Sequence, residues 1–370
     1  MRILHIYSGN LFGGIETTLL TFAAIQSEIS DFEQEFALCF PGRLWSELTA
    51  LNVQVHDLGK TNWRYPHTLI SSRSRLEDLL KKSFFDIVIC HSPWIIGIFG
   101  SIIHKVGLPL VFWAHDFLTG KSWVELTAFR SKPEWVICNS RYTLKSVQEQ
   151  YPGVRTEVIY CPVRKPPLLD PRAVRKRVRE NLKISESAVV LFQASRMEKS
   201  KGHSLVLEAL SELKDSPEWV ALFAGGAQRG HEKTYFDQMV RYSHQLGLGE
   251  RVQFLGQRSD VSELLLASDV FIQPNLMPET FGISFIEAMY AGLPTVGVAG
   301  GGVDEIVTEE AGILISKPQS ELLVPVLKEL IGSSEKRAVL GQNGKIRADQ
   351  LSNPIQQLLK TRDFLKVCLS

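Results

Sequence analysis

The chain has 370 residues, 44% of them hydrophobic and 22% charged, with a formal net charge of +1 at pH 7. Such a composition excludes a disordered chain, gives no reason to expect a nucleic-acid partner, and at this length predicts two domains. Five cysteines without C-x-x-C pairs, and the lack of a signal-peptide pattern or an apolar run of about 20 residues, predict a cytoplasmic protein without disulfides or membrane-spanning helices.

The first half alternates strand-like and helical patterns. Residues 2–7 form a continuous apolar run that ends at a glycine turn, and residues 15–25 follow with helical spacing. Continuous apolar runs separated by helical segments indicate a parallel sheet covered on both faces. The further runs expected as strands are residues 35–40, 53–58, 86–91, 110–115 and 135–139. The prediction is an α/β fold with a doubly wound sheet, whose ligand crevice lies beyond the strand carboxyl ends.

Gly13 and Gly14 lie between the first expected strand and the first helix. Glycines at this position let a ligand approach the backbone, and the amides at a helix start suit an anion. The turn lacks the G-x-G-x-x-G pattern, and no acidic residue closes the second strand, which argues against a nicotinamide enzyme. A tight turn without a ligand is the alternative.

Two histidines, His91 and His115, fall at the carboxyl ends of expected strands. We favour His115 as a site residue because Asp116 follows it and can orient its imidazole. For His91 an ordinary core histidine is the alternative. The sequence has no D-x-D pair of the kind that holds Mn²⁺ or Mg²⁺ at a diphosphate. We therefore expect no metal site and assign that work to cationic side chains.

Residues 61–83 combine arginines and lysines with aromatic and leucine side chains. They fit an amphipathic surface that docks on an anionic membrane, at the inner face of the plasma membrane. A solvated helix that packs its leucines against the sheet is the commoner structure for such a segment, and membrane contact is a hypothesis beside it. The Pro-rich residues 161–171 are expected to link the two domains, and the basic residues 171–180 are expected to form a solvated helix.

In the second half, Arg196 and Lys201 bracket a loop between an expected strand and a helix that starts near Gly202. Two cations at a strand end can neutralise a diphosphate as it leaves. Ordinary loop solubility is the alternative. The strand at residues 219–224 ends in Gly225 and Gly226, which we expect near a nucleotide.

Residues 278–303 contain two glutamates, Glu279 and Glu287, eight positions apart. Glu279 precedes an apolar helical run, and Glu287 lies inside it as the only charge between Phe281 and Val303. A buried carboxylate is costly without hydrogen bonds, so we expect a partner for Glu287 from outside this segment. An exposed Glu287 on an ordinary helix is the alternative. The orphan amides expected at the helix start, which suit an anion, are those of Phe281, Gly282 and Ile283.

The segment ETFGISFIEAMYAGLPTV, followed by GGGVDEIV, resembles the E-x7-E signature of glycosyltransferase family 4, which contains retaining nucleotide-sugar enzymes. The resemblance covers nearly the whole chain and is firmest from Gln193 to Val307. It implies the α/β GT-B architecture, with two Rossmann-like doubly wound domains facing across a cleft. The expected parts are an acceptor-binding domain (1–165), a nucleotide-sugar-binding domain (166–350) and a C-terminal helix that crosses back to the first domain (351–370).

The resemblance also implies roles for single residues. Glu279 would contact the donor sugar, Glu287 the ribose hydroxyls, and His115 the sugar or the acceptor. Arg196 and Lys201 reproduce the R-x4-K motif for the diphosphate, although Ser195 stands where glycine is usual. The residues expected at the catalytic centre are His115, Arg196, Lys201 and Glu279. Those expected to bind the donor are Gly13, Gly14 (with Glu16 completing a Gly-Gly-x-E turn), Arg196, Lys201, Gln257, Arg258, Glu279, Phe281, Gly282, Ile283 and Glu287.

The function implied is a retaining, metal-independent glycosyltransferase without a cofactor. It would move a hexose from a nucleotide sugar to a glycan or lipid-linked glycan acceptor in polysaccharide biosynthesis. UDP-glucose or another UDP-hexose is the expected donor from family frequency, with GDP- and ADP-sugars open. A non-catalytic nucleotide-sugar-binding protein and a dinucleotide-dependent sugar-modifying enzyme are the alternatives.

Overall fold

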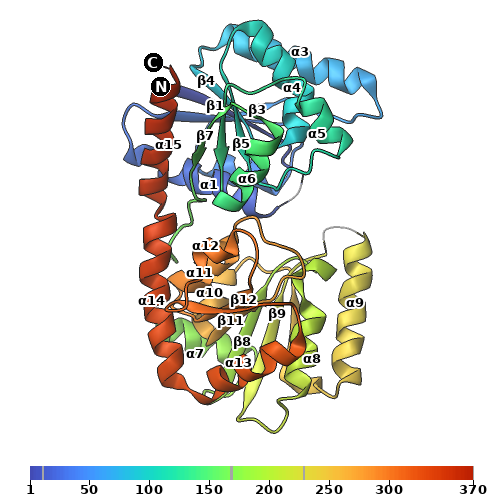
Figure 1. Ribbon diagram of the computed structural model, residues 1–370, viewed down its shortest axis with the longest axis vertical. Helices are drawn as coiled ribbons and strands as arrows, with labels where there is room; N and C mark the ends of the chain where they lie inside the picture. Colours follow the sequence, from blue (N-terminus) through green and yellow to red (C-terminus); the bar gives the residue numbers. More distant parts are fainter. Residues whose placement is uncertain (11, 167–169, 228–229, 370) are drawn as a thin grey trace. The chain divides into compact units, whose positions relative to one another are not determined.

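The structure, a computed structural model, describes residues 1–10, 12–166, 170–227 and 230–369. The chain divides into two compact units. The first comprises Met1–Val163 together with Ser352–Ser370, and the second comprises Arg164–Leu351. Each unit is built on its own parallel sheet (Figure 1). Ligands of such sheets bind beyond the carboxyl ends of the strands.

The sheet of the first unit has, within the described residues, the strand order β3-β2-β1-β4-β5-β6-β7. Its strands are β1 (Arg2–Tyr7), β2 (Glu33–Leu38), β3 (Val55–Asp57), β4 (Ile87–Cys90), β5 (Leu110–Ala114), β6 (Trp135–Cys138) and β7 (Arg155–Val158). Its helices are α1 (Gly14–Ile25), α2 (Arg43–Ala50), α3 (Pro66–Lys82), α4 (Pro93–Val106), α5 (Trp123–Ala128), α6 (Arg141–Gln150) and α15 (Pro354–Leu369).

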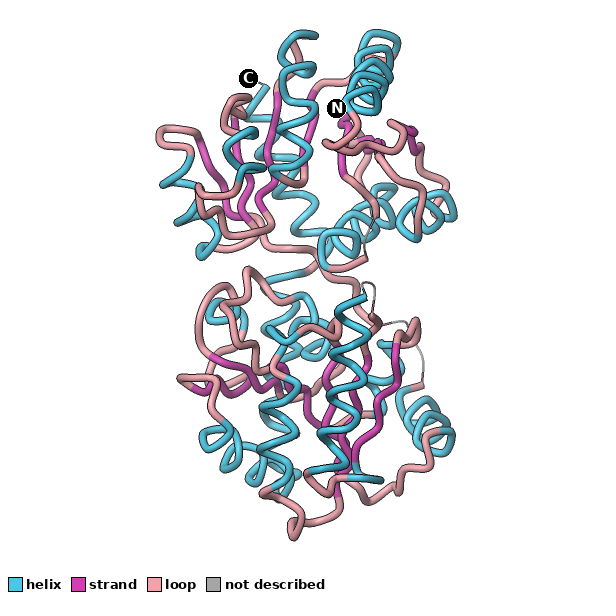
Figure 2. The backbone as a smooth tube through the Cα atoms, turned by 90° about the vertical axis from the view of Figure 1, so that its right-hand side faces the viewer, coloured by secondary structure: helices cyan, strands magenta, loops and turns pink. Residues whose placement is uncertain are grey.

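Both faces of this sheet are buried. Successive side chains of each central strand point to opposite faces, and each set packs against helices. On β5, Leu110 and Phe112 belong to a core with residues of α4. Val111 and Trp113, between them in sequence, belong to a second core with residues of α1 and α15. Figure 2 shows the strands, in magenta, running between helices. The C-terminal helix α15 is therefore a structural part of the first unit.

The sheet of the second unit has, within the described residues, the strand order β10-β9-β8-β11-β12-β13. Its strands are β8 (Val189–Ala194), β9 (Trp219–Ala224), β10 (Val252–Gly256), β11 (Val270–Gln273), β12 (Thr295–Val298) and β13 (Gly312–Ile315). Its helices are α7 (Pro171–Asn181), α8 (His203–Ser211), α9 (Gly230–Gln245), α10 (Val261–Ala267), α11 (Ile283–Tyr290), α12 (Val303–Ile306), α13 (Ser320–Gly332) and α14 (Ser334–Ser352).

Each sheet has one point where the strand order reverses, and ligands of doubly wound sheets bind beyond the strand ends at such a point. In the first unit it lies between β1 and β4, and in the second between β8 and β11. The loops that leave these four strands carry most of the residues predicted from the sequence. The predicted α/β fold of two doubly wound parallel sheets is confirmed.

The segment at residues 61–83 contains α3, whose leucines pack inward. Leu76 and Leu80 are buried in the core of the first unit, whereas Tyr65 and Ile70 are 55% and 69% exposed. The leucine face thus packs against the first unit, as expected for the solvated helix, which was one of the two alternatives. Among the helices of the described residues, none is both long and apolar enough to cross a membrane.

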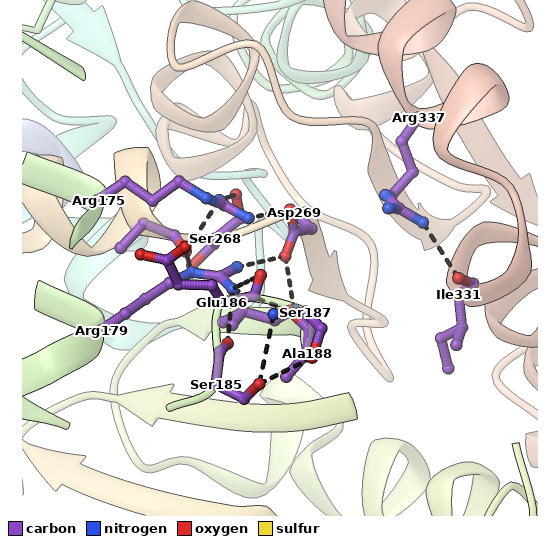
Figure 3. A network of polar contacts seen from close by, with 12 residues as sticks. Arg175, Arg179, Ser185, Glu186, Ser187, Ala188, Ser268, Asp269, Ile331 and Arg337 are labelled. Atoms are coloured by element: carbon purple, nitrogen blue, oxygen red, sulfur yellow. Dashed lines mark hydrogen bonds and ion pairs between the residues drawn. The ribbon is translucent and has the colours of Figure 1, made fainter. Parts of the chain in front are cut away.

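Helix α7 differs from the solvated helix predicted for residues 171–180. Arg179 is only 2% exposed, and its guanidinium donates to the Asp269 carboxylate and to four backbone carbonyls. Arg175 donates to the same carboxylate at 2.7 Å (Figure 3). The carbonyl groups that accept from Arg179 are those of Ser185, Glu186, Ala188 and Ala267. Because every charge in this network has hydrogen-bond partners, the network offsets the cost of burying the arginine and fastens α7 to the sheet.

Replacing Arg179 by alanine should therefore lower the free energy of unfolding of the second unit by about 3 to 5 kcal/mol, because Asp269 and the carbonyls lose their donor. Urea denaturation measures the change. Lys176→Ala, an exposed position on the same helix, is the matched control and should cost about 0.5 kcal/mol or less. Equal effects of the two substitutions would contradict a fastening role for Arg179.

Candidate active site

The site of the second unit is organised around Glu279, at the strand-order reversal between β8 and β11. Lys201, at the end of the 3₁₀ turn after β8, donates from Nζ to Oε2 of Glu279 at 2.9 Å. Asn275, just beyond β11, donates from Nδ2 to the same oxygen at 2.7 Å. The structure thus brings together the predicted pair Lys201 and Glu279 from distant parts of the sequence. Asn275 is a residue that the sequence reasoning missed.

The loop that carries Lys201 is held by buried hydrogen bonds. Gln193 of β8 donates from Nε2 to the backbone oxygen of Lys201 at 2.7 Å. Gly202 has a φ of +72°, and a Cβ there would lie 2.0 Å from the carbonyl oxygen of Pro274. Only glycine fits, so the loop after β8 touches the loop after β11 directly. Ser195, the predicted departure from glycine, is accommodated: its Oγ lies 3.1 Å from Nε2 of His203.

The other predicted cation, Arg196, lies on the same loop but has different partners. Its Nη1 is 2.6 Å from Oε1 of Glu198 and 4.0 Å from the buried Glu232. A bound diphosphate would compete with Glu198 for this guanidinium. Further along the strand edge, Gln257 and Arg258 are exposed, and Arg258 Nε donates to Asp260 at 2.8 Å.

Two glycine turns shape this edge of the sheet through close packing. A Cβ at Gly225 would lie 1.7 Å from the carbonyl oxygen of Ser195, and one at Gly226 would lie 2.9 Å from Cβ of Gln257. After β12, a Cβ at Gly301, where φ is +92°, would lie 2.2 Å from the backbone oxygen of Glu279. The amide of the next residue, Gly302, donates to that oxygen. The glycine-rich turn after β12 therefore fixes the backbone that carries Glu279.

Helix α11 begins at Ile283, slightly later than the sequence pattern predicted. Its N-cap is Gly282, with a φ of +114°, and no side chain of the described residues caps it. In the first turn the amide of Phe285 donates to the Gly282 carbonyl at 3.0 Å, whereas the amides of Ile283 and Ser284 precede the first intrahelical bond and lie at the positive end of the helix dipole. Phe281 is buried beside them. This helix start can bind an anion through its backbone.

Glu287 lies one turn into α11 and is partly buried. No donor from the described residues contacts its carboxylate, so the predicted protein partner from outside the segment is not found. Burial raises the pKa of this carboxyl to about 7. A ligand hydroxyl that donated to Glu287 would favour its charged form, and a perturbed acid of this kind is typical of functional sites.

In the first unit, His91 and His115 follow β4 and β5 directly and are hydrogen-bonded to each other. Nδ1 of His91 lies 3.0 Å from Nε2 of His115. Asp116 is exposed, and the imidazole of His115 is held at Nε2 by His91; a contribution of Asp116 to its orientation stays a prediction. His91 is itself fully buried. His91 is thus a buried, hydrogen-bonded core histidine, which was the alternative given for it. It is also the neighbour that orients His115.

The histidine pair extends into the sheet. Nε2 of His91 lies 2.9 Å from Nδ1 of His5, in β1, and Nε2 of His5 lies 3.1 Å from Oε1 of Gln34, in β2. Burial lowers the pKa of His5 to about 4 and that of His115 to about 3, and it lowers the pKa of His91 well below its ordinary value. All three rings are therefore neutral at pH 7. Neither His5 nor Gln34 was predicted from the sequence, because His5 is a single polar residue inside an apolar run and Gln34 lies just before the strand expected at residues 35–40.

The turn after β1 carries Gly13, Gly14 and Glu16. Glu16 is buried, and its Oε2 accepts from the Gly13 amide at 2.8 Å, which caps α1. Among the described residues, a Cβ at Gly13 would meet only this carboxylate, at 3.7 Å. Packing alone does not require glycine there, so close approach of a ligand remains a reason for it.

Within the described residues, no group of three or more His, Cys, Asp or Glu side chains is arranged to hold a metal ion.

Comparison with known families agrees with this arrangement. Residues 12–165 match the model described as Glycosyltransferase Family 4, and residues 174–347 match the model described as Glycosyl transferases group 1. The chain is a family 4 glycosyltransferase. A crystal structure of HepE from Anabaena, in complex with UDP and glucose, matches with a TM-score of 0.85 at 22% identity and covers 99% of each chain. The GT-B fold predicted from the sequence is confirmed.

Curated relatives of this glycosyltransferase include enzymes of lipopolysaccharide assembly. The glucosyltransferase WaaG of Escherichia coli is 30% identical over 47% of this chain and 46% of the relative. The mannosyltransferase LpsB of Rhizobium meliloti is 27% identical over 42% of this chain and 45% of the relative. The alignment thus spans about half the length of these relatives. Spore coat protein SA of Bacillus subtilis is 26% identical over 73% of this chain and 75% of the relative.

The raised pKa of Glu287 predicts how a substitution there changes stability with pH. Below about pH 4.5 the carboxyl is neutral in both the folded and the unfolded chain, so Glu287→Gln should leave stability unchanged. Between about pH 4.5 and 7 only the unfolded chain ionises, and the native chain loses stability. Above pH 7 the glutamine variant should be more stable by about 1 to 3 kcal/mol. Urea denaturation across this range measures the difference.

Glu309→Gln, at an exposed glutamate of the same unit, is the matched control for the loss of one carboxyl group. A Glu287→Gln difference that stays flat with pH would show that the Glu287 carboxyl has an ordinary environment.

Proposed function

We propose that this glycosyltransferase moves a hexose from a nucleotide-sugar donor, a UDP-hexose such as UDP-glucose, to a glycan or lipid-linked glycan acceptor, and that it retains the configuration at C1. The observation that carries the proposal is the Lys201–Asn275–Glu279 cluster beside the uncapped start of α11. The UDP and glucose in the HepE crystal structure support the choice of donor. The names of LpsB and WaaG support an acceptor of the lipopolysaccharide or polysaccharide kind.

The second unit binds the donor in this proposal. The diphosphate lies against the first-turn amides of α11, with Lys201 and Arg196 supplying positive charge. Glu279 accepts from the sugar hydroxyls and Glu287 from the ribose hydroxyls. The Lys201–Glu279 contact supports this order of groups, because a lysine between a carboxylate and a diphosphate is attracted to both. These positive groups also supply the charge that a metal ion would otherwise bring, so we propose transfer without a metal.

The chemical step exchanges one bond at the sugar for another. The C1–O bond to the diphosphate breaks, and a C1–O bond to the acceptor oxygen forms on the same face of the ring. The acceptor proton passes to a base that the step itself creates, an oxygen of the departing diphosphate. Negative charge grows on that leaving group, so fixed cations and helix amides accelerate the step more than they strengthen ground-state binding. We assign His115, in the first unit, to a hydroxyl of the sugar or of the acceptor.

Lys201→Ala should lower kcat for sugar transfer by about 10² to 10³-fold, because one preorganised donor to the developing charge is lost. Lys199→Ala removes an exposed lysine of the same turn and should leave kcat within about twofold. Transfer is measured with UDP-glucose and acceptor glycans from a lipopolysaccharide core, in buffer containing EDTA. Binding of the nucleotide sugar without transfer to any acceptor would point to a non-catalytic binding protein. Loss of transfer in EDTA would refute the metal-free scheme.

Contact of the first unit with an anionic membrane is part of the same proposal. Trp123 of α5 is 56% exposed and packs edge-on against Trp63, ahead of α3, with ring centroids 5.3 Å apart. Tyr65 and Ile70 are exposed on the same segment. Exposed aromatic and apolar side chains near lysines and arginines suit a lipid headgroup region.

The protein should co-sediment with liposomes rich in phosphatidylglycerol at low salt and dissociate as the salt concentration rises, because screening weakens headgroup attraction. Ile70→Ser should weaken the association, since it removes an apolar side chain that is 69% exposed. Val339→Ser, at a 54% exposed position of α14 in the second unit, is the control. A native chain that stays in the supernatant at low salt would end this part of the proposal.

A further inference from the structure

The three neutral imidazoles of His5, His91 and His115 are hydrogen-bonded in a row, which restricts which ring nitrogen of each can carry a hydrogen. Each ring carries one N–H and one bare nitrogen, so each contact between two rings needs exactly one hydrogen from one side. The contacts His5–His91 and His91–His115 can therefore point only in one common direction. Either every ring carries its hydrogen on Nε2 and donates toward Gln34, or every ring carries it on Nδ1 and donates toward His115.

The backbone oxygen of Phe22 decides between these two directions. Gln34 is 2% exposed, and its terminal amide lies between Nε2 of His5 and the carbonyl of Phe22, with Nε2 of Gln34 3.4 Å from that oxygen. A carbonyl oxygen can only accept, so the amide must turn its NH₂ group toward Phe22. The reverse orientation would bring two oxygens together without a hydrogen. Oε1 of Gln34 consequently faces His5 as an acceptor, and His5 must donate to it from Nε2.

We propose that Gln34, His5 and His91 are positioning residues that hold His115 in its Nε2–H form, so that Nδ1 of His115 is a bare acceptor. The direction is passed on from ring to ring. His5 donates to Gln34 and accepts from His91, and His91 in turn accepts from His115. The planes of neighbouring rings lie within 26° of each other, with centroids 5.1 and 5.3 Å apart, and the plane of His115 lies within 7° of that of Trp113. Rotation of any ring out of its plane would break its hydrogen bonds to the neighbouring rings.

The consequence concerns the kind of group that His115 can bind. Among the described residues Nδ1 of His115 has no partner, and it is not among the nitrogens sealed from solvent. A bare nitrogen accepts from a hydroxyl but repels a phosphate oxygen, which has no hydrogen to give. Resting on the proposed function, this restricts His115 to a hydroxyl of the sugar or the acceptor and excludes it from holding the diphosphate.

Nitrogen NMR tests the hydrogen positions directly. In protein labelled with ¹⁵N-histidine at pH 7.5, without substrate, long-range ¹H–¹⁵N spectra distinguish protonated from bare ring nitrogens, and single histidine substitutions assign the rings. We expect His5, His91 and His115 each to show a protonated Nε2 and a bare Nδ1. Protonated Nδ1 at His115, or exchange between two forms there, would overturn the proposal.

Substitutions at Gln34 test the origin of the direction. Gln34→Leu removes the acceptor for His5, so the chain can reverse, and Nδ1 of His115 should shift toward the protonated type. Gln26→Leu is the matched control, because the Gln26 side chain accepts from the backbone amide of Gln34, at 3.2 Å, and not from its terminal amide, so the His115 shifts should not change. Gln34→Glu should retain the native His115 shifts, since a neutral carboxyl group has the same shape as the amide and can donate to Phe22 and accept from His5.

Identical His115 shifts in Gln34→Leu and Gln26→Leu would refute the relay. Should Gln34→Leu fail to fold, the native spectrum and Gln34→Glu decide: changed His115 shifts in Gln34→Glu would count against the relay, and retained shifts for it. These spectra need neither donor nor acceptor. Absence of sugar transfer would therefore overturn the proposed function only. The hydrogen positions at His115 are decided by the NMR result alone.

Discussion

The contact between Lys201 and Glu279 is the interaction on which the site of the second unit depends. A half-buried ion pair gives little net stability, because desolvation of the two charges offsets most of their attraction. The fold nevertheless fixes both partners by backbone packing that tolerates only glycine, at Gly202 behind the lysine and at Gly301 behind the glutamate. Such rigid placement gives little stability by itself, but it would favour the binding of a third charged group beside the pair, which in the proposed function is the donor diphosphate.

The two units use the same edge of the same kind of sheet in opposite electrostatic ways. In the second unit the groups at the strand-order reversal are charged and sit at the rim, where water and ligand can reach them. In the first unit the chain from His5 to His115 starts inside the sheet, where a charge would be costly, so its members stay neutral and satisfy one another. Neutral rings bring no positive charge to a diphosphate, but they can fix which ring nitrogen carries a hydrogen. This contrast fits a division into anion binding and hydroxyl recognition.

Much of the fold and of the candidate site could be predicted from the sequence, because glycines, charged residues and apolar runs are visible as local patterns. The runs at β1, β4, β5 and β8 predicted their strands. The polar edge strand β7 and the short strands β12 and β13 were missed, because they lack a long apolar run. Asn275 was missed since an asparagine after a strand is common in loops. The chain of His5 and Gln34 depends on which strands are neighbours, and the burial of Arg179 depends on carbonyls brought in by tertiary structure.

Several polar groups around the Lys201 loop lack partners within the described residues, and together they indicate the chemistry of a ligand that would satisfy them. Oε1 of Gln193 and Oδ1 of Asn275 are buried acceptors without a donor. Each belongs to an amide whose nitrogen is already used, one on the Lys201 backbone and one on Glu279. Turning either amide would lose a hydrogen bond, so only water or a ligand hydroxyl can satisfy these oxygens. With Glu287 they form a set of acceptors, and the positive groups nearby are Lys201 and the α11 amides. A molecule rich in hydroxyl groups that also carries a compact negative charge satisfies both sets at once, and a nucleotide sugar has that chemistry.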